Sequence, residues 1–177
     1  MRTLILDPPP AKLEELLEDR RRSGLDRLDE VWEGVLHMIP APSGQHAIIA
    51  QQLAELLGPP ARAAGLVATM HEFNLGDGEH DFRVPDGGLH RTPPLGAWHS
   101  TAALVVEIVS PGDETRDKLP FYAAHGVDEI IIVDPQDRSV EWLALGEGRY
   151  RSLQTSGLIG LGPGELARRL EWPPVGR

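Results

Sequence analysis

Two short apolar runs constrain the fold of this chain more than any other feature. Residues 102–109 read Ala-Ala-Leu-Val-Val-Glu-Ile-Val, and residues 129–134 read Glu-Ile-Ile-Ile-Val-Asp. Such runs, rich in β-branched residues and without regular alternation, are typical of strands covered on both faces. Between them we expect a helix over about residues 114–125, or a shorter one that begins near Pro120, because proline is tolerated only in the first turn. This order predicts a parallel strand–helix–strand crossover.

Other segments add antiparallel strands and covering helices. Two apolar stretches separated by Glu33-Gly34 predict a hairpin over residues 29–38. A second helix is expected to end at the Gly-Pro-Pro sequence of residues 58–60. The other expected elements are helices over about 10–22, 45–57 and 164–170, and strands over about 67–75, 82–86, 139–145 and 150–153. The predicted fold class is α/β (mixed α+β), with a central mixed β-sheet flanked by helices.

Size and composition limit the classes of protein to which the chain can belong. Its 177 residues fit one domain, and 41% hydrophobic with 25% charged residues is typical of a globular protein. No apolar run approaches the ~20 residues of a membrane span, and the apolar start is too short for a secretion signal. The chain has no cysteine, which excludes disulfides, thiolate zinc sites and thiol catalysis. This composition fits a cytoplasmic protein.

The charge balance argues against one class of nucleic-acid binder. The formal net charge is -10, whereas tight, nonspecific binding needs a large positive surface. A nuclease is still compatible with this charge, because a local basic groove and bound cations act over short screening lengths. The chain has fifteen arginines but only two lysines, Lys12 and Lys118. A lysine is a compact point charge, so Lys118 stands out as a candidate for catalysis.

Two acids and this lysine form the candidate site. Glu107 interrupts the first apolar run, where a carboxylate is costly to bury unless it is paired or metal-bound. Asp86 is expected to close the preceding strand, so the two carboxylates can meet at one sheet edge if the strands are neighbours. Two carboxylates and one ammonium can hold a divalent cation and activate a water. The alternatives are that Asp86 is a turn acid after proline, that Glu107 pairs with an arginine, and that Lys118 is a surface lysine.

Several motifs carry a resemblance to a known family. They are Val84-Pro85-Asp86, Leu104-Val105-Val106-Glu107-Ile108-Val109-Ser110-Pro111, Asp117-Lys118 with Tyr122, Gly126-Val127 and Ile131-Ile132-Val133-Asp134-Pro135, preceded by Glu30-Val31-Trp32-Glu33-Gly34-Val35-Leu36 and Pro42-Ser43 with His46. Together they look like the Uma2-type putative restriction endonuclease family, of the PD-(D/E)XK nuclease superfamily. The resemblance covers roughly residues 27–145. It implies one restriction-endonuclease-like domain over residues 1–177, with a helical lead-in at about 10–23 and a core at about 27–155.

The resemblance also implies roles for individual residues. Asp86 and Glu107 would ligate Mg²⁺ or Mn²⁺, with the Ile108 carbonyl as a third ligand. The chain has Val109 where a standard nuclease of the superfamily has lysine, but Uma2-type proteins carry that lysine on the following helix, where Lys118 matches it. Lys118 would orient the attacking water and stabilise the charge of the transition state. The second-tier candidates near the site are His46 and Asp113.

The expected function is therefore hydrolysis of DNA phosphodiester bonds by a Mg²⁺- or Mn²⁺-dependent endonuclease. A homodimer would supply the two active sites that double-strand cleavage needs, although no segment of the sequence identifies an interface. The alternative is a catalytically inactive module that keeps the nuclease scaffold and serves nucleic-acid or protein interaction. The acidic balance and the lack of basic clusters favour this alternative.

Overall fold

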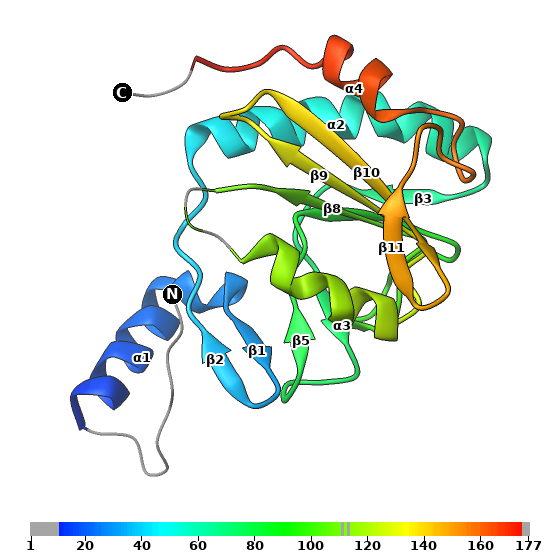
Figure 1. Ribbon diagram of the computed structural model, residues 1–177. Helices are drawn as coiled ribbons and strands as arrows, with labels where there is room; N and C mark the ends of the chain where they lie inside the picture. Colours follow the sequence, from blue (N-terminus) through cyan, green and yellow to red (C-terminus); the bar gives the residue numbers. More distant parts are fainter. Residues whose placement is uncertain (1–10, 111, 113, 175–177) are drawn as a thin grey trace.

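A six-stranded mixed sheet forms the centre of the molecule in the computed structural model, which describes residues 11–110, 112 and 114–174. Figure 1 shows it below α2 and α4. Its strand order is β11-β10-β9-β8-β6-β3, and the only parallel pair among these described strands is β8–β9. The bounds are Val67–Thr69 (β3), Gly87–His90 (β6), Leu104–Ile108 (β8), Glu129–Asp134 (β9), Ser139–Gly146 (β10) and Arg149–Ser152 (β11). The two apolar runs are thus β8 and β9, and the predicted parallel crossover is confirmed.

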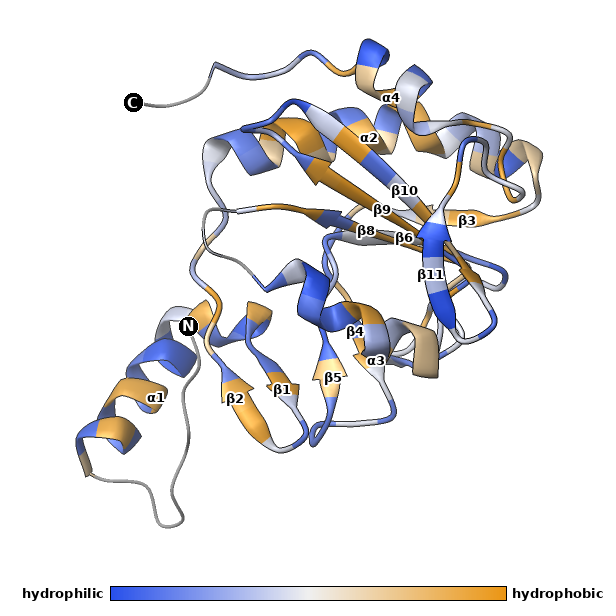
Figure 2. Ribbon diagram, in the orientation of Figure 1, coloured by the Kyte–Doolittle hydropathy of each residue, from blue (hydrophilic) through white to orange (hydrophobic). Residues whose placement is uncertain are grey.

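Alternation along β8 assigns its side chains to two cores. Leu104, Val106 and Ile108 belong to the core beneath α2 (Gly44–Ala63) and α4 (Pro163–Arg169). Val105 faces the other way, into a core shared with α3 (Leu119–Ala124). Because side chains alternate along a strand, Glu107 points to this second side. Figure 2 shows β9 as a largely hydrophobic strand, as expected for a strand buried on both faces.

The helix α2 is longer than the sequence predicts. It runs through Pro59 and Pro60 to Ala63, although we expected it to end near residue 57. Each proline removes a backbone hydrogen bond of the helix. The apolar stripe nevertheless continues at four-residue spacing, and all its members are fully buried: Ile49, Leu53, Leu57 and Ala61. Packing of this stripe on the sheet therefore outweighs the local cost of the prolines.

A second, five-stranded sheet was not predicted. Its order is β2-β1-β5-β4-β7, with bounds Val35–His37, Glu30–Trp32, Phe82–Arg83, Asn74–Gly76 and Trp98–His99, respectively. The β1–β2 hairpin is confirmed, with Trp32 paired to Val35. The single strand expected over 67–75 is wrong, because β3 lies in the larger sheet and β4 in the smaller one. The chain crosses between the sheets at residues 70–73.

A second crossing between the sheets places Asp86. We expected Asp86 to close a strand, but β5 ends at Arg83 in the smaller sheet, and Asp86 directly precedes β6 in the larger one. β6 pairs antiparallel with β8, so Asp86 still lies beside the carboxyl end of β8, where its N–H donates to the Val106 carbonyl at 3.0 Å. Gly88 permits close approach here, since a Cβ on it would lie 2.9 Å from the Leu104 carbonyl oxygen.

The crossover from β8 to β9 begins with a tight turn. A 3₁₀ turn, η2 (Thr115–Lys118), precedes α3, and Pro120 lies in the first turn of α3. The shorter of the two predicted helices therefore agrees with the structure. At the other end of the chain, α1 (Ala11–Ser23) is followed by the 3₁₀ turn η1 (Leu25–Leu28). Among the described residues, no helix combines the length and apolar character needed to cross a membrane.

Candidate active site

Glu107 is the buried centre of the candidate site. Its side chain leaves β8 on the face opposite α2, and the residue is only 3% exposed. The Lys118 ammonium donates to both carboxylate oxygens at 3.1 Å, and the Tyr122 hydroxyl donates to Oε1. Both partners come from the crossover, because Lys118 ends η2 and Tyr122 lies in α3. Glu107 and Lys118 therefore form a direct ion pair in the structure, and the partner of Glu107 is this lysine rather than an arginine.

Asp86 lies on the neighbouring strand edge, beside the backbone of β8. Its Oδ2 accepts a hydrogen bond of 2.6 Å from the Ile108 N–H, and its Oδ1 lies 2.9 Å from Nε2 of His46. Ser43 caps the start of α2 by accepting from the His46 N–H at 3.2 Å, which fixes the first turn that carries this imidazole. The structure therefore brings Asp86, Glu107, Lys118 and the second-tier candidate His46 together.

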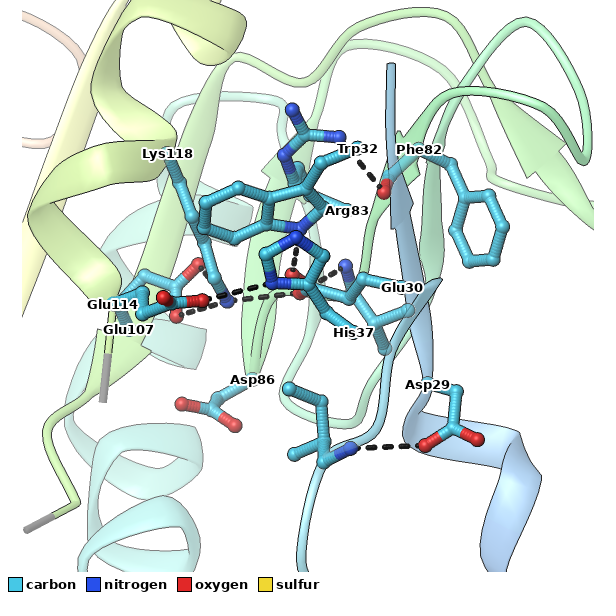
Figure 3. Close-up of polar contacts among 12 residues, drawn as sticks. Asp29, Glu30, Trp32, His37, Phe82, Arg83, Asp86, Glu107, Glu114 and Lys118 are labelled. Atoms are coloured by element: carbon cyan, nitrogen blue, oxygen red, sulfur yellow. Dashed lines mark hydrogen bonds and ion pairs between the residues drawn. The ribbon is translucent and has the colours of Figure 1, made fainter. Parts of the chain in front are cut away.

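A third carboxylate, Glu30, was missed by the sequence analysis. It lies in β1, in the smaller sheet, and is 1% exposed. Its Oε1 lies 2.9 Å from the Lys118 Nζ and accepts from the Val84 N–H at 2.8 Å, while its Oε2 accepts from the Trp32 Nε1–H at 2.7 Å. Figure 3 shows Lys118 reaching between Glu30 and Glu107. A signal was present in the sequence: Glu30 and Trp32 are two apart in a strand and so share one face.

The β1–β2 hairpin closes one side of the site through aromatic stacking. The Trp32 and His37 rings stack with centroids 4.0 Å apart, and His37 Nδ1 lies 2.8 Å from the Glu114 carboxylate. On the other side of the indole, the Arg83 guanidinium lies 4.5 Å from the Trp32 ring and 4.0 Å from the Phe121 ring. Together with the Glu30–Lys118 pair, these contacts attach the hairpin to the crossover.

Burial and mutual charge shift the protonation of the site. Burial raises the pKa of Glu107 to about 8; the Lys118 ammonium opposes this shift, and the Asp86 and Glu30 carboxylates add to it. Burial lowers the pKa of Lys118, but the carboxylates of Glu107 and Glu30 outweigh it and raise that pKa above its usual value. The lysine therefore stays charged, whereas burial disfavours the charged form of Glu107.

Burial also acts on the groups at the rim of the cluster. It lowers the pKa of His46, but the hydrogen bond to Asp86 and the Asp86 charge outweigh it, so the pKa is raised overall. Burial and the carboxylate of Glu107 raise the pKa of Tyr122 well above its usual value, so its hydroxyl remains a hydrogen-bond donor.

The donor set fits a hard divalent cation by type. Carboxylate oxygens are the ligands that Mg²⁺ prefers, and Mg²⁺ keeps several waters rather than requiring a full protein cage. Asp86 and Glu107 supply two such groups, and a bound cation would offset the negative charge that burial disfavours at Glu107. Within residues 11–110, 112 and 114–174, no group of three His, Cys, Asp or Glu side chains is arranged to hold a metal ion. Asp113 lies outside the described residues.

Two clefts flank this cluster. One, of about 390 Å³, is lined by η2 and the ends of β9 and β10; its charged side chains are Glu114, Asp117, Asp134, Asp137 and Glu141, with Arg116 as the one cation. This acidic lining repels a polyanion. The other, of about 280 Å³, is lined by Val84 together with Arg27, His71, Glu72 and His99. Its lining is less acidic than that of the first cleft.

Comparison with known proteins identifies the family. A model of the Uma2 family, described as "Putative restriction endonuclease", matches residues 13–169. No curated protein matches the chain. The crystal structure of a putative nuclease belonging to DUF820, from Anabaena variabilis ATCC 29413, is 18% identical with a TM-score of 0.64, over 80% of this chain and 90% of that one. That likeness establishes the fold. Because the family model spans most of its length, the chain belongs to the Uma2 family.

Proposed function

We propose that this protein is a metal-dependent endonuclease that hydrolyses phosphodiester bonds of DNA. The observation that carries the proposal is the buried Glu107 carboxylate, held by Lys118 and next to the Asp86-bound Ile108 amide. Family membership supports a nucleic acid as the substrate. A buried, charged cluster with this composition costs stability, and a catalytic role gives the reason why the chain retains it.

Each residue has a defined chemical task under this proposal. Asp86 and Glu107 hold Mg²⁺ or Mn²⁺, and the Ile108 carbonyl is the third candidate ligand. A cation held there would supply Lewis-acid charge at the scissile phosphate and would favour ionisation of the attacking water. Lys118 orients the attacking water and stabilises negative charge that develops in the transition state. His46 fixes the rotamer of Asp86 through the 2.9 Å contact.

The test is cleavage of supercoiled plasmid DNA in Mg²⁺ or Mn²⁺. Asp86→Ala and Lys118→Ala should each lower the rate by about 100-fold or more, as expected for loss of one charge-stabilising group. Asp134→Asn is a control, because Asp134 is the acid that ends the central strand β9 and its carboxylate only caps the turn to Gln136 and Asp137. It should cleave within about two-fold of the wild type. Cleavage that survives both substitutions in the site would contradict the proposal.

The non-catalytic alternative is favoured by one specific observation. All oxygens of Asp86 and Glu107 already have protein partners: Ile108 and His46 for Asp86, and Lys118 and Tyr122 for Glu107. A module that keeps only the scaffold would leave these contacts intact and bind no cation. Calorimetric titration with Mn²⁺ separates the two functions. Binding that Glu107→Ala abolishes excludes the alternative, whereas no heat of binding in the wild type favours it.

A further inference from the structure

The Lys118 ammonium has no donor left for substrate in the structure. A lysine has three N–H donors, and three carboxylate oxygens surround this one. Oε1 of Glu30 lies at 2.9 Å, and the two oxygens of Glu107 lie at 3.1 Å. A lysine that orients water must release at least one of these contacts. The question is which of the two carboxylates releases the ammonium and which one keeps its hydrogen bond to it.

The surroundings of the two carboxylates answer this question. Glu30 is fixed by two further donors, the Val84 N–H at 2.8 Å and the Trp32 Nε1–H at 2.7 Å. These donors belong to the smaller sheet or to its continuation, so they do not depend on the metal-binding edge. Glu107, by contrast, is the proposed metal ligand and must turn oxygens toward a cation. Its remaining partner is the Tyr122 hydroxyl, a single side-chain donor.

We propose that Glu30 is a positioning residue for the hydrolytic reaction: it holds the Lys118 ammonium in place while Glu107 binds the cation. Glu30 then keeps one N–H of Lys118, and the two N–H groups released by Glu107 point to the attacking water and the phosphate. This inference rests on the proposed function. It adds a third acid, from the other sheet, to the predicted Asp86, Glu107 and Lys118. Without it, the ammonium would follow the Glu107 carboxylate or move into solvent.

The chain offers a direct spectroscopic readout, because Lys12 and Lys118 are its only lysines. In a Lys12→Arg background, the lysine ammonium signal in ¹⁵N-resolved NMR reports on Lys118 alone. The wild-type ammonium should stay protected from exchange with water when Mg²⁺ is added, because Glu30 still holds it. In Glu30→Gln, the same signal should disappear on addition of Mg²⁺. A purely structural role for Glu30 would not make the loss depend on the metal.

The kinetic test uses a matched buried glutamate as its control. Glu129 is 5% exposed and also accepts from an indole N–H, that of Trp142 at 2.9 Å, but it lies on β9 and contacts Ser156 and Gly157 rather than a lysine. Glu30→Gln should lower kcat for plasmid or duplex cleavage by about 10- to 100-fold, with KM changed by less than about three-fold. Glu129→Gln should leave both constants within about three-fold, even where it lowers the melting temperature.

The outcomes separate this inference from the proposed function. If the wild type binds Mg²⁺ and cleaves DNA, but Glu30→Gln keeps both the protected ammonium signal and wild-type kcat, the role of Glu30 is refuted and the endonuclease stands. If the wild type shows neither a Mg²⁺-dependent change nor cleavage, both proposals fall. Should Glu30→Gln not fold, Glu30→Asp takes its place. It keeps the charge but withdraws the carboxylate by one methylene, and the same loss of the Mg²⁺-bound ammonium signal is expected.

Discussion

Glu107 combines two properties that rarely occur together in one residue. It is a carboxylate inside a fully buried strand, and it shares the Lys118 ammonium with a second buried carboxylate, Glu30. Burial of a charge is costly unless pairing compensates it. One ammonium cannot balance three carboxylates, so the raised pKa of Glu107 follows from the local charge count as well as from burial. A divalent cation would restore the balance, which links the electrostatics of the site to its proposed chemistry.

The pKa of Glu107 leads to a prediction for the metal-free protein. Between pH 4.5 and 8, the folded protein holds a proton on Glu107 that the unfolded chain has lost, so this residue lowers the free energy of unfolding as the pH rises. Glu107→Gln cannot lose a proton. In EDTA, the variant should gain about 3 kcal/mol on the wild type between pH 5.5 and pH 8.5. Urea unfolding at both pH values measures this gain, and a constant difference would show that Glu107 does not titrate in this range.

At the scale of single elements, α2 shows why local signals mispredict a boundary. Gly58, Pro59 and Pro60 form a strong stop signal in the sequence, yet the helix continues to Ala63. A stop signal reports the cost of the backbone alone. The gain from packing Leu57 and Ala61, both fully buried against the sheet, appears only once the fold is known. In β8, β9 and the β1–β2 hairpin, the apolar pattern and the backbone signals agree. These elements were therefore predicted correctly.

This balance between backbone and packing can be measured. Pro59 is an exposed position inside the helix, so Pro59→Ala restores a backbone donor without changing the core. We expect it to raise the free energy of unfolding by about 1 kcal/mol. Leu57→Ala removes a fully buried side chain and should lower the same quantity by about 2–5 kcal/mol. Chemical denaturation of both variants checks the pair. A loss of stability in Pro59→Ala would mean that the prolines stabilise the end of α2.

At the scale of the whole molecule, the site lies where two sheets meet. Glu107 lies on β8 and Asp86 directly before β6 of the larger sheet, and Lys118 lies in the crossover, so the structure brings together the three residues that the sequence and the family resemblance singled out. Glu30 belongs to the smaller sheet. No pattern in the sequence indicates that the chain passes from one sheet to the other at residues 70–73 and again at 84–86. Without knowledge of the two sheets, Glu30 is indistinguishable from any acid at the start of a hairpin.

Arg83 lies between the smaller sheet and α3, and this position leads to a prediction for the stability of the whole fold. The Arg83 guanidinium is only 5% exposed and lies between Trp32 of the hairpin and Phe121 of α3, and it also donates to the Val31 carbonyl at 2.9 Å. Arg83→Met keeps the aliphatic part but removes these interactions. It should lower the free energy of unfolding by about 2–3 kcal/mol.

A matched arginine gives this prediction its control. Arg91 forms an exposed ion pair with Asp128, in which the two side chains are 57% and 45% exposed. Exposed pairs of this kind contribute little, so Arg91→Met should change the free energy of unfolding by less than about 1 kcal/mol.

Because Arg83 links the hairpin that carries Glu30 to the helix that follows Lys118, its loss should also slow DNA cleavage, although it contacts neither Glu107 nor Asp86. Equal stability of the two variants would show that the hairpin is held to the crossover by other contacts, with the His37–Glu114 and Glu30–Lys118 pairs as the next candidates.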